Sequence, residues 1–190
     1  MQKGERGLMG GYVWRYALWA SLLFALVYFE GFSPLFFLGE LQTELTAFLT
    51  GQGIALFSMP VHMQGHALVF EHGMKLFIVR ECSGLATIVL FWAAVLAFPT
   101  TPGSKAAWLF IGYAVLTMLN LVRILAVAYG VSFDPGSLGW AHDIAGRYGM
   151  GLLTLALFWI FTLRTEVVRR GAPFAFLFNT FKSRRPDEGF

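Results

Sequence analysis

Long apolar runs dominate this sequence and restrict what it can fold into. The hydrocarbon core of a bilayer is about 30 Å thick, so a spanning helix needs roughly 20 mostly apolar residues. The chain has three clear runs of this kind and one shorter one, at residues 16–29, 85–98, 106–129 and 148–163. Its composition, 57% hydrophobic and 13% charged, exceeds what one soluble core of this length needs. The runs predict an all-α integral membrane protein with about four transmembrane helices.

These helices set the expected organisation of the chain. We expect them at about 14–30, 83–99, 105–130 and 142–164, within a single membrane domain over residues 1–190. Residues 31–81 then form a segment outside the membrane, and residues 165–190 form a basic tail. The first run follows a basic N-terminus, but YFEGFSPLFF offers no small-x-small cleavage site. An uncleaved anchor is therefore expected.

The distribution of Lys and Arg predicts the orientation, because basic residues near helix ends are retained in the cytoplasm. With the N-terminus inside, the cytoplasmic pieces hold ten of the 14 basic residues: Lys3, Arg6, Arg15, Lys105, Arg164, Arg169, Arg170, Lys182, Arg184 and Arg185. Both termini are thus expected in the cytoplasm, and the chain is expected in the cytoplasmic (inner) membrane. The net charge of +3 reflects this topology and attraction to anionic membrane lipid, not nucleic acid.

The segment 31–81 has two parts. Apolar residues three or four apart predict an amphipathic helix on the outer surface of the membrane: Leu38, Leu41, Leu45, Phe48 and Leu49. An alternative is that residues 45–59 dip through the bilayer, although Gly51, Gln52 and Gly53 interrupt the pattern. The following stretch, VHMQGHALVFEHGMKLFIVREC, has two β-prone runs joined by EHG and predicts a small extracytoplasmic β-hairpin over residues 61–79.

Three polar residues from different segments are expected at one depth near the outer membrane boundary. At about 1.5 Å per helical residue, Cys82 lies roughly 24 Å above Phe98, and Arg123 lies roughly 26 Å above Ala106. His142 precedes the last helix on the same side. A thiol, a guanidinium and an imidazole thus share one layer.

Cys82 has two interpretations. A single cysteine in an apolar chain is usually a small buried hydrophobe. Residue 82, however, is expected at a helix N-terminus, where the helix dipole stabilises a thiolate, and Arg80 is close by. Ser83 and Gly84 would open the helix, with Gly84 leaving room for a substrate backbone. We therefore interpret Cys82 as reactive.

Arg123 interrupts the apolar run LTMLNLVRILAVAY, where a charge costs on the order of 2.5 to 3.5 kcal/mol. Such a residue normally faces the bundle and has a function. Asn120, on the same helical face, is expected either to hold the guanidinium by a hydrogen bond or to form a hydrogen bond to another helix. His142 is either an interfacial residue or a general base. Asp143 would point elsewhere on a helix and is a poor partner for His142.

His62, His66, His72 and Glu71 form a competing constellation. Three histidines in so short a stretch are compatible with a metal site, but the spacing lies across the expected hairpin and matches no helix-borne zinc motif. The sequence therefore predicts no metal site and no other cofactor.

Three sequence blocks together resemble a known family. ECSGL opens one membrane helix, NLVRI lies near the outer end of the next, and AHDIAG opens the last. In this order they are similar to the signature blocks of the exosortase/archaeosortase family, over about residues 29–163. This chain has about four spans rather than about eight, and resembles the compact subgroups.

The resemblance implies a membrane cysteine transpeptidase. Cys82 would correspond to the nucleophile, and Arg123 and His142 to the family's arginine and histidine. The implied partners are exported proteins that end in a short motif, a membrane helix and a basic cluster. Two rival functions remain open: a plain membrane cysteine protease that uses the same residues, and a non-enzymatic membrane scaffold or transporter subunit in which Arg123 and His142 line an interface.

Overall fold

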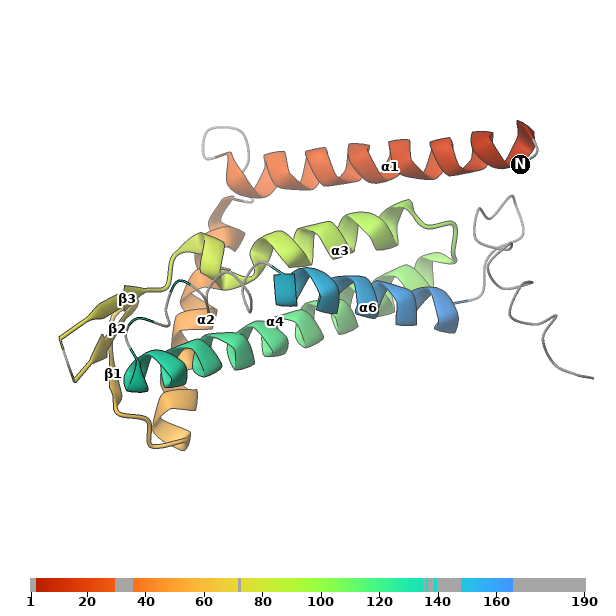
Figure 1. The fold of residues 1–190 in the computed structure, drawn as a ribbon. Coiled ribbons are helices and arrows are strands. Elements are labelled where there is room, and N and C mark those ends of the chain that lie inside the picture. The colour runs from red at the N-terminus through yellow and green to blue at the C-terminus, as the bar shows by residue number, and fades with distance from the viewer. Residues whose placement is uncertain are drawn as a thin grey trace, which may run out of the picture.

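Four helices run alongside one another in the computed structural model, which describes residues 3–29, 36–71, 73–134, 136, 139 and 148–165 (Figure 1). They are α1 (Lys3–Tyr28), α3 (Leu85–Ala97), α4 (Pro102–Phe133) and α6 (Met150–Arg164). α3 packs against each of the other three and is the centre of the bundle. Of this fully described helix, Leu90 is the one large apolar side chain that is exposed. The near-continuous apolar run of α3 is explained by this burial on all sides.

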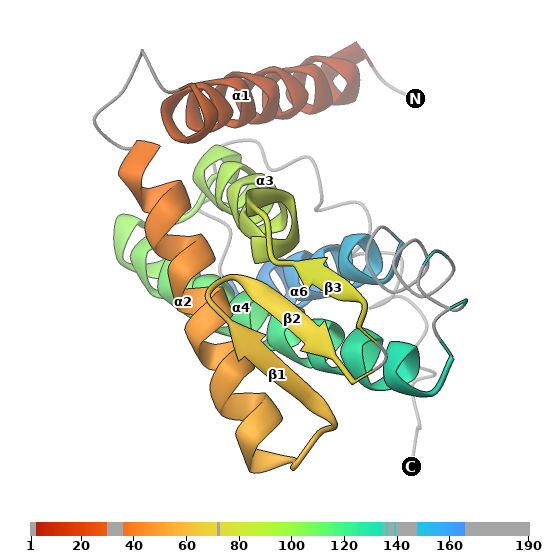
Figure 2. The same cartoon turned by 90° about the vertical axis from the view of Figure 1, so that its left-hand side faces the viewer.

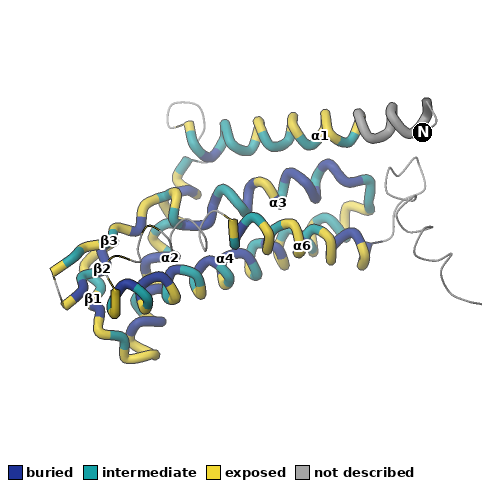
Figure 3. Tube along the Cα trace, viewed as in Figure 1, coloured by how far each residue is buried: buried dark blue, intermediate teal, exposed yellow. Residues whose placement is uncertain are grey.

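The other bundle helices carry many exposed apolar side chains. Figure 3 shows where exposed residues lie along each helix. Exposed large side chains on α1, α4 and α6 include Trp14, Leu18, Leu22, Phe110, Ile111, Met118, Val122, Leu152, Leu155, Trp159, Ile160 and Leu163. Soluble monomers rarely expose contiguous apolar patches of this extent, so this surface is suited to lipid.

The prediction of four membrane-spanning helices is supported in part. Among the described residues, α4 is the one helix that is both long enough and apolar enough to cross a membrane by itself. α3 and α6 are apolar but have 13 and 15 residues, fewer than the roughly 20 that span a hydrocarbon core. The predicted start of the last helix, at residue 142, lies outside the described residues. The other three spans stay predictions.

The turn between α3 and α4 lies in the Pro-containing stretch FPTTPGSK. α3 ends at Ala97, and the side chain of Thr101 caps α4 by accepting a hydrogen bond from the backbone N–H of Ser104 at 3.4 Å. Pro102 occupies the first turn of α4, where its missing N–H costs no hydrogen bond. The two helices then approach closely at Gly112, where a Cβ atom would lie 2.1 Å from the ring of Phe91. Glycine at this position lets an aromatic ring of α3 pack on the backbone of α4.

An aromatic cluster packs α6 against the C-terminal end of α3 and the N-terminal part of α4. The ring of Phe161 lies 5.2 Å from that of Phe98 and 5.5 Å from that of Trp108, both edge to face. Phe158 completes the group at 6.2 Å from Phe98. Such edge-to-face pairs stabilise packing beyond their buried area.

A fifth helix and a small sheet lie at one end of the bundle (Figure 2). Helix α2 (Phe36–Leu56) runs across the direction of the bundle helices (Figure 1). The sheet is an antiparallel meander of β1 (Val61–Gln64), β2 (Ala67–Phe70) and β3 (Lys75–Phe77). Its apolar side packs with the last turns of α4 around Ile124, Val127 and Val131.

The hairpin prediction was incomplete, because three strands form instead of two. The first β-prone run folds back on itself through Gly65 and His66, so that Gln64 pairs with Ala67. A two-residue loop that begins with glycine is a common hairpin connection, and this signal inside the run was overlooked.

The predicted helix forms as α2, and it packs against the rest of the protein through a face that the leucine spacing does not mark. The apolar residues Leu41 and Phe48 are exposed, at 54% and 63% of their surface. The buried face instead carries small and polar residues: Gly39, Gln42, Thr46, Ala47, Thr50, Gly53 and Ile54. Small and hydroxyl side chains let helices approach closely in an apolar environment and form hydrogen bonds between them. The apolar face of α2 is therefore free to contact lipid.

Candidate functional site

Cys82 lies in a single turn of 3-10 helix, η1 (Arg80–Ser83), that joins the sheet to α3. Its backbone N–H donates to the carbonyl of Val79 at 2.9 Å, and its side chain is half-buried and unpaired as a free thiol. The sequence predicted Cys82 at the first turn of α3. The α-helix instead begins at Leu85, because Gly84 interrupts it in a left-handed conformation.

Gly84 is required at this break for two reasons. Its φ of 76° is strained for any residue with a side chain. In addition, a Cβ atom at this position would lie 2.9 Å from Cγ of Asn120. The space that the sequence analysis assigned to a substrate backbone is therefore filled by Asn120, and that prediction was wrong.

Asn120 connects the thiol-bearing turn to the guanidinium. Its amide Nδ2 donates to the backbone carbonyl of Cys82 at 2.9 Å, and its Oδ1 accepts from Nη1 of Arg123 at 3.0 Å. Asn120 is 1% exposed, so both bonds form away from solvent. The expected pairing of Asn120 with Arg123 is confirmed, and the amide also holds the backbone at Cys82.

Cys82 and Arg123 line the same cavity, which has a volume of about 30 Å³. The rest of its lining is apolar and comes from β3, the residue that follows it, and α4: Leu76, Phe77, Ile78, Ile124 and Val127. A volume of this size holds roughly one or two water-sized atoms. It is suited to a carbonyl oxygen, not to a whole side chain.

The guanidinium of Arg123 keeps an unused donor in this region. Its Nε is buried and has no hydrogen-bond partner among the described residues. Among the described residues, Arg123 forms no ion pair with a carboxylate. The observed ion pair joins Arg80 and Glu40 instead. A half-buried cation beside an apolar cavity favours a group that carries negative charge.

Arg80, which was expected to assist the thiolate, interacts with α2. Its guanidinium lies 4.0 Å above the ring of Phe36 and 4.0 Å from the carboxylate of Glu40. These contacts fasten one end of η1 to α2, and none of them involves Cys82. A role for Arg80 beside the thiol stays a prediction.

Ser83 is buried, and its hydroxyl stabilises the turn by hydrogen bonds to the backbone. Its hydroxyl donates to the carbonyl of Arg80 at 2.7 Å and accepts from the backbone N–H of Leu85 at 3.4 Å. The backbone carbonyl of Ser83 accepts from Nε2 of Gln42 at 3.3 Å. The hydroxyl of Tyr113 in turn donates to Oε1 of Gln42 at 2.8 Å.

Gln42 and Tyr113 were not among the site residues that the sequence predicted. A signal was nevertheless present. Gly39, Gln42, Thr46, Thr50 and Gly53 recur every three or four residues, and such a stripe of small and polar residues is typical of close packing between apolar helices.

The third predicted catalytic residue, His142, lies outside the described residues, as does Asp143. The structure therefore brings Cys82, Asn120 and Arg123 together and leaves the position of His142 as a prediction. The competing histidine cluster is also only partly described, since His72 is not. No group of three potential metal ligands occurs among the residues that the structure describes.

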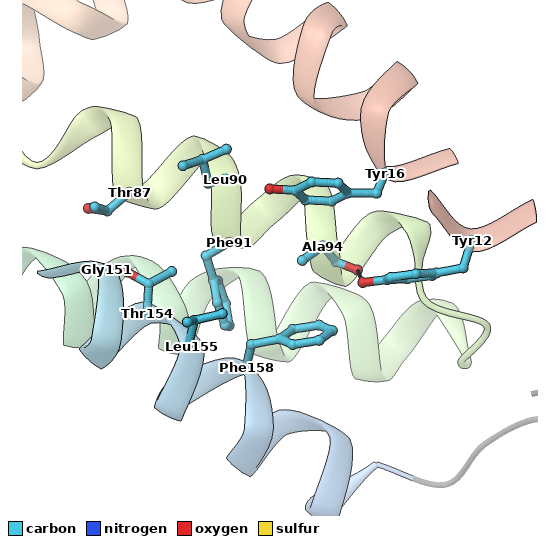
Figure 4. Close-up of a pocket in the computed structure, with 10 residues that line it drawn as sticks. All are labelled: Tyr12, Tyr16, Thr87, Leu90, Phe91, Ala94, Gly151, Thr154, Leu155 and Phe158. Atoms are coloured by element: carbon cyan, nitrogen blue, oxygen red, sulfur yellow. Dashed lines mark hydrogen bonds between the residues drawn. The ribbon is translucent and has the colours of Figure 1, made fainter. Parts of the chain in front are cut away.

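A second and larger cavity lies between α1, α3 and α6, and has a volume of about 450 Å³ (Figure 4). Its lining includes Leu90, Phe91, Leu155 and Phe158. The hydroxyl of Tyr12, also in its lining, donates to the carbonyl of Ala94 at 3.4 Å. None of its lining residues is a nucleophilic thiol or an ionised group at neutral pH.

The bundle and the small cavity define a membrane protein with a candidate cysteine site. The chain matches the family model of the transmembrane exosortases over residues 7–159, which include Cys82, Asn120, Arg123 and His142. It belongs to the transmembrane exosortase family. No curated protein and no solved structure matches it.

Proposed function

We propose that this protein is a membrane cysteine transpeptidase that cleaves the C-terminal sorting signals of exported proteins and transfers the cleaved protein to an acceptor. The observation that carries this proposal is the cavity shared by Cys82 and Arg123. Membership of the exosortase family supports it independently. In this account the site faces away from the cytoplasm, and both termini lie in the cytoplasm.

Acylation is the first step. The thiolate of Cys82 attacks the carbonyl carbon of the scissile peptide bond, and the carbonyl oxygen becomes an oxyanion. The guanidinium of Arg123, which lines the cavity, stabilises this charge, and such an interaction is stronger in apolar surroundings than in water. His142 accepts the proton of the thiol and gives it to the departing amine, which leaves an acyl-enzyme thioester.

Transfer is the second step. An amine or hydroxyl of the acceptor attacks the thioester carbonyl, and His142 takes its proton as the new bond forms. The thiolate of Cys82 departs and is reprotonated. If water attacks instead, the same residues perform hydrolysis, so the identity of the second nucleophile separates a transpeptidase from a protease.

The substrate would be positioned by the membrane. Its own C-terminal helix diffuses laterally to the bundle, and its basic cluster remains on the cytoplasmic side. The cleavage motif then reaches the layer of Cys82, beside β3. Phe77 lines the cavity and is 60% exposed, so it is available to contact residues next to the scissile bond.

The test is the fate of an exported protein from the same genome that ends in a shared motif, an apolar helix and a basic cluster. We expect Cys82→Ala to leave it full-length, while the variant accumulates in the membrane like the wild type. Mass spectrometry of the processed C-terminus then separates the functions. An added group indicates transfer, a free carboxylate indicates a protease, and normal processing by Cys82→Ala contradicts both.

A further inference from the structure

We propose that Gln42 and Tyr113 are positioning residues that hold the nucleophile's turn in the geometry for acylation. This inference rests on the proposed function. It begins with two consecutive backbone carbonyls, those of Cys82 and Ser83, each of which accepts a hydrogen bond from a side-chain amide. Asn120 of α4 binds the first at 2.9 Å, and Gln42 of α2 binds the second at 3.3 Å.

Each amide is itself oriented by a donor from α4. The oxygen of Asn120 accepts from Arg123 at 3.0 Å, and the oxygen of Gln42 accepts from the hydroxyl of Tyr113 at 2.8 Å. Because a donor occupies each oxygen, each NH₂ group must face the turn. Each amide therefore acts as a clamp, meaning that it holds one backbone carbonyl of the turn by a hydrogen bond. Donors on α4 fix the orientation of both amides.

The hydrogen bond from Gln42 to the Ser83 carbonyl forms in a buried region. Gln42 is 4% exposed, and its Nε2 also lies 3.5 Å from the hydroxyl of Thr117. The hydroxyl of Thr46, one turn along α2, lies 3.5 Å from the same Ser83 carbonyl. A buried amide is costly unless its groups are paired, so this network specifies one arrangement of α2, η1 and α4.

Loss of the Gln42 hydrogen bond would change the distance between the thiol of Cys82 and the guanidinium of Arg123. Arg123 is fixed on α4, whereas Cys82 is on a short turn that a left-handed glycine separates from α3. Without the Gln42 clamp, the Ser83 carbonyl keeps only the longer contact with the hydroxyl of Thr46, at 3.5 Å, so the turn is held less tightly. A displacement of about 1 Å at such a site can reduce the rate on the order of 100-fold.

Two chemical probes separate positioning from folding. An activated aryl ester acylates the thiol through an oxyanion, and therefore requires Arg123 to be in place. Iodoacetamide alkylates the thiol by direct displacement and forms no oxyanion. If Gln42 positions the turn, Gln42→Ala reduces Cys82 acylation by about 10- to 100-fold and changes alkylation by less than about threefold.

Tyr113→Phe gives a milder second test, because the ring stays and only the hydroxyl is lost. We expect an acylation rate about 3- to 10-fold below the wild type, and a double variant no slower than Gln42→Ala, since Tyr113 acts through Gln42. Thr50→Val is the matched control. Thr50 is a fully buried hydroxyl of α2 that bonds to Thr46 within its own helix, and its loss should leave both rates unchanged.

The measurement uses the full-length protein in lipid nanodiscs. If Gln42→Ala does not fold, Tyr113→Phe decides the question by itself. Acylation of the wild type that both variants leave unchanged overturns this inference alone, as does an equal fall in acylation and alkylation. A wild type that shows no Cys82-dependent acylation overturns the proposed function and the inference with it.

Discussion

The side-chain amide of Asn120 donates a hydrogen bond of 2.9 Å to the backbone carbonyl of Cys82. This contact joins the third bundle helix of the chain to the turn that carries the thiol. Since the same amide accepts from Arg123, the positions of the nucleophile and the cation depend on one residue.

Replacing Asn120 should impair catalysis more than stability. Asn120→Asp keeps the size of the side chain and can still accept from Arg123, but it has no donor for the Cys82 carbonyl. We expect a fall of about 10- to 100-fold in kcat/KM for cleavage of a sorting signal. Met118→Ala, at an exposed position of the same helix, is the control and should retain its activity. Wild-type activity in Asn120→Asp would contradict the role of this bridge.

The guanidinium of Arg123 should be needed as a directed donor, not only as a charge. Arg123→Ala removes both functions, and we expect kcat to fall about 10²- to 10³-fold. Arg123→Lys keeps the charge but lacks the planar group that reaches Asn120 and the cavity together, so an intermediate loss is expected. Single-turnover cleavage measures the chemical step. If Arg123→Lys equalled the wild type, charge alone would explain the residue.

Gly84 should be sensitive to the smallest substitution. In Gly84→Ala the new Cβ meets Asn120 at 2.9 Å and the backbone keeps a left-handed φ of 76°. We expect destabilisation by about 1 to 3 kcal/mol, measured as a lower Tm in lipid nanodiscs.

The matched control for that substitution is Gly103→Ala, in the first turn of α4. A Cβ atom there meets no atom within 4 Å, and its φ is an ordinary one. This variant should unfold at or slightly above the wild-type temperature, because alanine favours a helix. An equal loss of stability in both variants would remove the special role assigned to Gly84.

Phe77 should affect substrate binding without affecting the nucleophile. It lines the cavity from β3 while more than half of its surface is exposed. We expect Phe77→Ala to raise KM several-fold and to leave the alkylation of Cys82 by iodoacetamide unchanged. Phe57→Ala, equally exposed in the turn after α2, is the control. An unchanged KM would show that β3 does not contact the substrate.

The helices could be predicted because their causes are local. Apolar runs place α1, α3, α4 and α6, and Thr101 with Pro102 marks the start of α4. The pairing of Asn120 with Arg123 could likewise be predicted from the sequence, since residues three apart share a helical face. These features depend on spacing within one segment.

The remaining features depend on contacts between segments. Amphipathic spacing identifies α2 as a helix, but in an apolar environment the leucine face does not have to be the packed one. The contact between Gln42 and Ser83 joins residues 41 positions apart, and no local pattern specifies it. The space beside Gly84 was predicted to be open because the sequence does not reveal that Asn120 fills it.

Trapping the acyl-enzyme would show whether Cys82 is the nucleophile. The full-length protein would be incubated with a purified sorting-signal substrate, quenched in acid, digested and analysed by mass spectrometry. The account predicts a hydroxylamine-sensitive thioester on the peptide that contains Cys82, and loss of both adduct and cleavage in Cys82→Ala. Substrate cleavage that persists in Cys82→Ala, or an adduct on another residue, would contradict it.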